Sequence, residues 1–169
     1  SISKAEEETT VNGYPINEEH HGYILEAMEY VDINDPLEII TESDVPSGAG
    51  MGSSAAVTVS TLASLHDFTG NIDEERLAKE AFNVEWNVQG NASPIDTSTS
   101  THGNAVMLSR KKESDFLWSI EKDDNIWNIH HRDIPDMQMV VGDTGIHART
   151  GPLVEKVRRF YTNNNFAKQ

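Results

Sequence analysis

The chain has 169 residues, 37% of them hydrophobic, and its 28 acidic and 13 basic side chains leave a formal net charge of −15. A surface this acidic repels nucleic acid and anionic membranes, so neither is expected as a partner. With no cysteine, no leader sequence and no apolar run near the roughly 20 residues that span a bilayer, the chain is expected to be cytoplasmic and free of disulfides and thiolate metal sites.

The first part of the chain is predicted to alternate short β-type segments with helices. Asn12-Gly13, set among polar residues, predicts a hairpin turn. Apolar side chains recur at helical spacing over residues 20–28 and again over 53–68, which predicts two amphipathic helices. Between them, a compact β-rich run over 37–41 predicts a strand that leads into a glycine-rich loop.

The rest of the chain is predicted to continue with two helices and then strands. A helix with acidic side chains in its first turn is expected from residue 71 or 73 to about 89, followed by a short helix or turn over 96–103. Strands are expected at 105–108, 116–120, 127–131 and, as an apolar run of the buried type, 137–141. A final helix over 152–161 is expected to have Thr150 as its N-cap.

The glycine-rich loop before the second helix carries the strongest chemical signal. Gly48, Gly50 and Gly52 stand at alternate positions, and Ser53 and Ser54 follow at the start of the helix. Backbone N–H groups and the helix dipole favour an anion at such a place, so the pattern predicts a phosphate-binding loop. The spacing fits neither the Walker A motif, nor the dinucleotide-binding fingerprint, nor the hydrolase nucleophile elbow.

The run from Pro46 to Ala56 reads Pro-x-Gly-x-Gly-x-Gly-Ser-Ser-Ala-Ala and resembles the phosphate loop of the GHMP kinases. This resemblance implies that the loop holds the phosphates of ATP. The residues that it assigns to ATP binding are Pro46, Gly48, Ala49, Gly50, Met51, Gly52, Ser53, Ser54 and Ala55. A glycine turn that merely caps a helix is the structural alternative.

A second segment carries two acidic side chains downstream of the loop. A kinase that acts on an alcohol needs a carboxylate near the hydroxyl and an acidic ligand for Mg²⁺ beside the phosphates. From Glu85 the sequence reads Glu-(x)7-Ser-Pro-x-Asp-(x)3-Ser-Thr-x-Gly, which resembles the mevalonate kinases of this family, especially the archaeal type. The resemblance implies that Asp96 is the catalytic base, that Glu85 and Ser54 hold Mg²⁺, and that Ser93 contacts the substrate. By residue type alone, an aspartate after a proline is more typical of a helix N-cap.

The segment that follows the apolar run at 137–141 is similar to the start of the C-terminal half of the same kinases. The resemblance implies that Asp143 and Thr144 lie on the substrate side, while a turn that caps the next helix is an equally open alternative. Asn104 departs from the family, which has a second glycine at this position. We expect a local difference in the backbone there, without a loss of activity.

The resemblance also implies an α+β fold of the two-domain GHMP-kinase type. Residues 1–134 are expected to form most of the N-terminal, ATP-binding domain, without the first strands of that domain. This domain is expected to be a mixed sheet with helices on one side. Residues 135–169 are expected to begin a ferredoxin-like C-terminal domain that is only partly present. Because the family's lysine-bearing first segment and its closing glycine loop are not found in this sequence, the chain alone is expected to be a poor kinase.

The activity that the resemblance implies is the ATP- and Mg²⁺-dependent phosphorylation of the primary hydroxyl of mevalonate to 5-phosphomevalonate, in isoprenoid biosynthesis. Phosphomevalonate kinase and homoserine kinase stay open as alternatives, as does a non-catalytic or fragmentary nucleotide-binding protein of the same fold. The expected partner is a small-molecule substrate, and a homodimer is left open.

Overall fold

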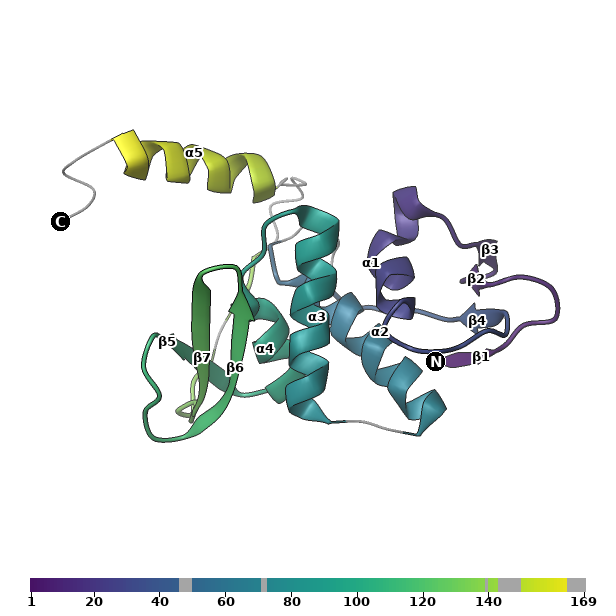
Figure 1. Cartoon of the computed structure of the whole chain (residues 1–169), viewed down its shortest axis with the longest axis horizontal. Coiled ribbons are helices and arrows are strands. Elements are labelled where there is room, and N and C mark those ends of the chain that lie inside the picture. The colour runs from purple at the N-terminus through teal and green to yellow at the C-terminus, as the bar shows by residue number, and fades with distance from the viewer. Residues whose placement is uncertain (46–49, 71–72, 139, 143–149, 164–169) are drawn as a thin grey trace. The chain divides into compact units, whose positions relative to one another are not determined.

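The computed structural model describes residues 1–45, 50–70, 73–138, 140–142 and 150–163 (Figure 1). The chain divides into two compact units. The larger unit consists of residues 1–42 and 54–138, and the smaller unit of residues 43–53 and 139–169. The helices and strands of the larger unit give it the mixed composition expected of an α+β protein.

Four short strands form a mixed sheet in the larger unit, in the order β1-β4-β2-β3. They are β1 (Ile2–Lys4), β2 (Thr10–Val11), β3 (Tyr14–Pro15) and β4 (Leu37–Ile39). β4 pairs parallel with β2 and antiparallel with β1, and β2 pairs antiparallel with β3. Asn12 and Gly13 connect β2 to β3 with φ angles of 52° and 80°. Positive φ at both positions is what a two-residue hairpin turn of type I′ requires, so the predicted turn is confirmed.

Three helices predicted from apolar periodicity are confirmed as α1 (Glu18–Met28), α2 (Ser53–Thr69) and α3 (Glu74–Gln89). The segment over 96–103, expected as a short helix or turn, belongs to the helix α4 (Pro94–His102). Asp73 caps α3, where its side chain accepts a hydrogen bond from the backbone N–H of Glu75 at 3.0 Å. Gly90 ends α3 in the left-handed conformation, with a φ of 71°. None of the helices in the described ranges is long and apolar enough to cross a bilayer.

A second sheet lies in the same unit and is entirely antiparallel, with the order β5-β7-β6. Its strands are β5 (Ala105–Ser109), β6 (Phe116–Lys122) and β7 (Asn125–Arg132), which confirms the three strands predicted for this stretch. The strands therefore divide between two sheets, of which the first alone is mixed.

Helix α3 lies between α1 and the antiparallel sheet in Figure 1. It contributes to two hydrophobic cores because it carries apolar side chains on two sides. Leu77, Ala81 and Val84 join a core formed with α1, α2 and the mixed sheet. Ala78 and Phe82, one residue further along at each turn, join a second core with the antiparallel sheet. Two sets of apolar residues at helical spacing, offset by one position along α3, therefore allow this helix to pack into both cores.

The strand predicted at 137–141 is wrong for the residues that the structure describes there. Met137, Val140 and Val141 are exposed at 55%, 98% and 66% and lie in no strand. An apolar run becomes a strand only where a neighbouring strand satisfies its backbone, and no described strand pairs with these residues. The final helix is confirmed as α5 (Thr150–Asn163), in which Thr150 is the first helical residue and not the residue before the helix.

Candidate active site

Ser54 and Glu85, both predicted to hold Mg²⁺, lie side by side in the larger unit. The Oγ of Ser54 donates a hydrogen bond of 2.7 Å to Oε1 of Glu85. Ser54 lies in the first turn of α2, directly after the glycine-rich loop in the sequence. Glu85 lies on α3 at helical spacing from the buried Ala78 and Phe82, which carries its side chain to the buried side of the helix. The fold of α2 and α3 therefore creates the pair.

The carboxylate of Glu85 is buried, with only 4% of the residue exposed. Burial raises the pKa of Glu85 above its ordinary value, and the negative charge of Asp96 raises it further. Hydrogen bonds from Ser54 and Gln89 act in the opposite direction, because they stabilise the ionised form. The effect of burial is larger than that of the hydrogen bonds, so the pKa of Glu85 is raised. The surroundings therefore compensate the negative charge of Glu85 only in part.

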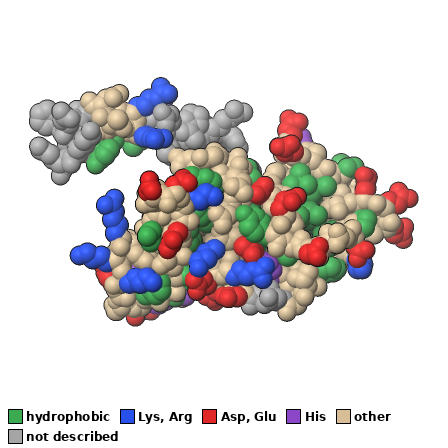
Figure 2. Space-filling view, in the orientation of Figure 1, with side chains coloured by type: hydrophobic (Ala, Val, Ile, Leu, Met, Phe, Trp, Pro, Cys, Tyr) green, Lys and Arg blue, Asp and Glu red, His purple; other side chains and the backbone are tan. Residues whose placement is uncertain are grey.

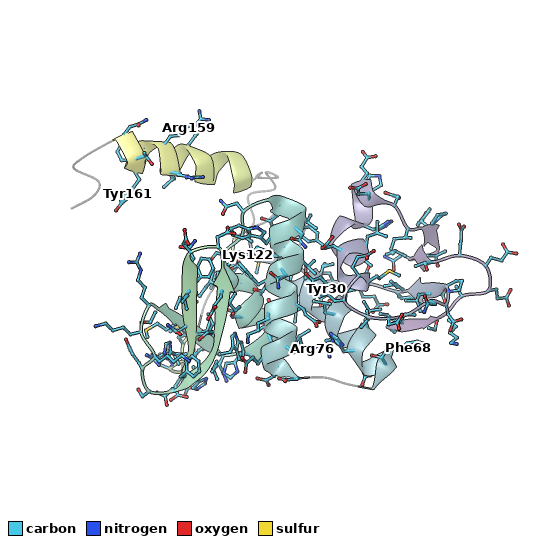
Figure 3. The ribbon with its side chains drawn as sticks, in the orientation of Figure 1. Tyr30, Phe68, Arg76, Lys122, Arg159 and Tyr161 are labelled. Carbon is cyan, nitrogen blue, oxygen red and sulfur yellow. The ribbon has the colours of Figure 1, made fainter. Side chains whose placement is uncertain are left out.

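No cation among the described residues pairs with Glu85. Arg76, on the same helix, instead contacts Glu80 at 2.7 Å. Lys122 of β6 lies over the ring of Trp86, 5.6 Å from its centre (both cations are labelled in Figure 3). A buried carboxylate without a paired cation is costly to ionise, and a bound metal ion would relieve that cost.

Two residues that sequence reasoning missed complete the surroundings of Glu85. The Nε2 of Gln89 donates to Oε1 of Glu85 at 3.4 Å and to the hydroxyl oxygen of Tyr23 at 3.1 Å. Burial also raises the pKa of Tyr23. Gln89 lies four residues after Glu85 on a predicted helix, and this spacing indicates that the two side chains can meet. Tyr23 is 66 positions from Gln89, so no local pattern in the sequence indicates their contact.

Asp96 lies in the first turn of α4, and its side chain is exposed. The N-cap of α4 is Ser93, whose Oγ accepts a hydrogen bond from the backbone N–H of Ile95 at 3.4 Å. The alternative reading of Asp96 as the N-cap is therefore wrong. Within the described chain, no hydrogen bond or ion pair engages the Asp96 carboxylate, although its charge acts on Glu85.

The structure describes part of the glycine-rich loop, in the smaller unit. Gly50 and Gly52 have φ angles of 72° and 67°, a region that other residues enter only with strain. The backbone conformation at these two positions of the motif therefore favours glycine. Met51 is exposed, Ser53 is half-buried and Ala55 is buried. The remaining predicted residues, Pro46, Gly48, Ala49, Asp143 and Thr144, lie outside the described residues.

The family model for the GHMP kinases N terminal domain matches residues 22–104, a segment that holds Ser54, Glu85 and Asp96. Over this segment the chain is therefore similar to the GHMP kinases. It is 39% identical over 99 residues to the mevalonate kinase of Archaeoglobus fulgidus, which covers 56% of this chain and 35% of that protein. It is 32% identical over 145 residues to the mevalonate kinase of Thermococcus onnurineus, which covers 82% of this chain and 39% of that protein.

Two solved structures of mevalonate kinases resemble part of this chain in fold. One superposes with a TM-score of 0.52 at 25% identity and covers 60% of this chain and 40% of that chain. The mevalonate kinase of Methanococcus jannaschii superposes with a TM-score of 0.51 at 26% identity and the same coverage. The chain spans between about a third and two fifths of the length of these curated and structural relatives.

Asn104, where the sequence departs from the GHMP-kinase pattern that it resembles, has a backbone explanation. Asn104 follows Gly103, which ends α4, and has a φ of 51°. Glycine enters the left-handed region freely, and asparagine tolerates it better than most other residues. Asparagine can therefore occupy this left-handed position, and the difference from the family pattern is local to the backbone.

The oxygen atoms of Ser54 and Glu85 would suit Mg²⁺ bound together with phosphates. Mg²⁺ is usually held by one or two carboxylates plus substrate phosphates and water, not by a cage of protein ligands. Ser54 and Glu85 offer a hydroxyl and a carboxylate oxygen within one contact. The described residues contain no group of three or more His, Cys, Asp or Glu side chains able to hold a metal by themselves.

Other acidic side chains of the described chain do not form a site suited to a nucleotide. In Figure 2 the acidic side chains are scattered over the visible face and do not gather at one place. A groove between α1 and α3 is lined by Glu18, Glu26 and Glu29 together with the apolar Leu25 and Val88. Three carboxylates at its rim repel phosphate groups, so the groove is not the phosphate site.

Proposed function

We propose that this chain acts in the ATP-dependent phosphorylation of the primary hydroxyl of mevalonate to 5-phosphomevalonate, a step of isoprenoid biosynthesis. The mevalonate kinases among its relatives support this choice of acceptor, at 39% and 32% identity for the two proteins above. The single observation that carries the proposal is the 2.7 Å hydrogen bond between Ser54 and Glu85. It joins the helix that follows the phosphate-loop motif to the carboxylate that the family resemblance assigns to the metal.

In this proposal Ser54 and Glu85 bind Mg²⁺, which when bound neutralises phosphate charge during phosphoryl transfer. The Ser54 hydroxyl can donate its proton to Glu85 and still offer an oxygen lone pair to another partner. The backbone amides of the loop around Gly50 and Gly52 bind the phosphates of ATP. Six further residues keep their proposed part in ATP binding: Pro46, Gly48, Ala49, Met51, Ser53 and Ala55, of which Ala55 is buried near the start of α2.

Asp96 is the proposed base, which accepts or orients the proton of the substrate hydroxyl. The two carboxylates of the site differ in a way that suits different tasks. Glu85 is buried and hydrogen-bonded, whereas Asp96 is exposed and has no described hydrogen-bond partner. A held carboxylate suits a metal ligand, and an accessible one suits proton transfer. Ser93, Asp143 and Thr144 are proposed to contact the substrate.

The domain assignment is part of the same proposal. Residues 1–134 would then belong to the N-terminal domain and residues 135–169 to the start of the C-terminal domain. Both relatives above are considerably longer than this chain, which spans 35% and 39% of their lengths. The proposal is therefore best tested within a complete kinase.

The experiment is a chimera in which the aligned segment of the Archaeoglobus fulgidus mevalonate kinase is replaced by that of this chain. ATP-dependent phosphorylation is then measured with mevalonate, phosphomevalonate and homoserine as acceptors. We expect mevalonate to be the preferred acceptor. A preference for either of the other alcohols would refute the proposed substrate, and failure of the folded chimera to bind ATP with Mg²⁺ would refute the proposed reaction.

A further inference from the structure

Gln89 lies between two hydrogen-bond partners that come from different helices. Its Nε2 donates to Oε1 of Glu85 at 3.4 Å, within α3, and to the hydroxyl oxygen of Tyr23 at 3.1 Å, on α1. A side-chain amide nitrogen has two hydrogens, so both donors of Gln89 are in use. The two hydrogen bonds together therefore fix the orientation of the Gln89 amide group.

The hydrogen bonds that reach Glu85 end on one of its two carboxylate oxygens. Ser54 and Gln89 both donate to Oε1. Among the described residues, Ser54 and Gln89 are the donors to Glu85, and neither donates to Oε2. A carboxylate held through one oxygen in this way has a defined rotamer and keeps the other oxygen for a ligand.

We propose that Gln89 is a positioning residue, which together with Tyr23 orients the Glu85 carboxylate so that Oε2 is the oxygen offered to Mg²⁺. This inference rests on the proposed function, in which Glu85 is a metal ligand. Partners behind a ligand raise metal affinity because they remove the freedom that the ligand would otherwise lose on binding. Neither Gln89 nor Tyr23 needs to touch the metal or the substrate for this effect.

A neighbouring contact between the same two helices provides a matched control. Asn87, two residues before Gln89, donates from Nδ2 to Oε1 of Glu26 on α1 at 2.6 Å. Asn87 and Gln89 are both exposed, and both tie α3 to α1. Asn87 has no hydrogen bond to Glu85, so its loss disturbs the helix pair without releasing the carboxylate.

The test measures binding of ATP to the full chain by calorimetry over a range of Mg²⁺ concentrations, with thermal unfolding of the metal-free chain as the second readout. We expect Gln89→Leu to weaken the apparent Mg²⁺ affinity by about tenfold to a hundredfold. Tyr23→Phe keeps the ring packing but removes the acceptor, so it should shift the affinity in the same direction by less. Asn87→Leu should leave the affinity within about twofold of the parent.

Three results would overturn the inference. Unchanged Mg²⁺ affinity in Gln89→Leu would mean that Gln89 does not position the carboxylate. An equal loss in Asn87→Leu, or a loss that tracks the unfolding temperature across the three variants, would mean that the effect is general to the α1–α3 contact. Glu85→Gln separates these results from a failure of the proposed function: if it binds ATP with unchanged dependence on Mg²⁺, Glu85 is not a metal ligand at all.

Discussion

The hydroxyl of Ser54 donates a 2.7 Å hydrogen bond to the carboxylate of Glu85, a residue 31 positions further along the chain. The contact joins the first turn of α2 to the C-terminal half of α3, beside a carboxylate that is 4% exposed. Burial destabilises the ionised form of Glu85 more than the hydrogen bonds stabilise it, so the pKa of Glu85 lies above its ordinary value. The pair is thus a buried acidic centre at the end of the phosphate-loop motif.

Replacing Glu85 with glutamine should alter how the stability of the metal-free chain depends on pH. Because the pKa of Glu85 is raised in the folded state, the folded chain binds the proton more tightly than the unfolded chain. The free energy of unfolding therefore falls as the pH rises from the ordinary pKa to the raised one, and it stays lower above that range. In Glu85→Gln this fall should be absent.

Urea unfolding in the presence of a chelator, from about pH 4 to pH 8, checks this prediction. Glu121→Gln, at an exposed position of β6, controls for the loss of one negative charge. Identical pH profiles of the parent chain and Glu85→Gln would contradict the buried, uncompensated state of this carboxylate.

Asp96→Asn should remove most turnover of the chimeric kinase while ATP still binds. A general base typically contributes about 10² to 10⁴ in rate, so a loss of that size in kcat is expected. Asp96 is exposed and has no described hydrogen-bond partner, so the substitution should leave the folded state intact. The measurement pairs steady-state kinetics with calorimetric binding of ATP and Mg²⁺. Near-normal turnover would exclude Asp96 as the base.

Gly50→Ala should weaken the binding of ATP with Mg²⁺, while Gly13→Ala should not. Both glycines have positive φ angles, 72° and 80°, and an added Cβ would meet no atom within 4 Å at either position. Each substitution therefore costs about 1–2 kcal/mol in backbone conformation alone. Gly50 lies in the proposed phosphate loop and Gly13 in the hairpin turn between β2 and β3.

Calorimetric binding of ATP together with thermal unfolding separates the two effects. Equal losses of ATP affinity in Gly50→Ala and Gly13→Ala would show that the change acts through general stability and not through the loop.

Phe82→Ala should lower the free energy of unfolding by about 3–5 kcal/mol, because it opens a cavity in the second core. Phe82 is fully buried, and its ring lies 5.7 Å from the rings of both Trp86 and Trp127. Phe68, near the end of α2, is 41% exposed (Figure 3), and its replacement by alanine should cost far less. Urea unfolding followed by circular dichroism compares the two; similar losses would contradict the burial of Phe82.

Several elements could be predicted from local sequence because their determinants are local. The turn at Asn12-Gly13, the cap at Asp73 and the left-handed end of α3 at Gly90 each depend on residues within a few positions. The strand expected at 137–141 failed for the opposite reason. A strand depends on a partner elsewhere in the chain, and an apolar run cannot indicate whether that partner exists.

The sequence by itself determined the helices, the turns and the residue types of the site. Motif order identified Ser54, Glu85 and Asp96 as candidates, and all three lie within residues 22–104, which match the model of the GHMP kinases N terminal domain. Only the tertiary structure decided that α3 is shared by two cores, that Glu85 is buried against Ser54, and that Gln89 and Tyr23 surround it. Helical periodicity depends on residues close together in the sequence, whereas the burial and hydrogen-bond partners of a carboxylate depend on which helices pack together.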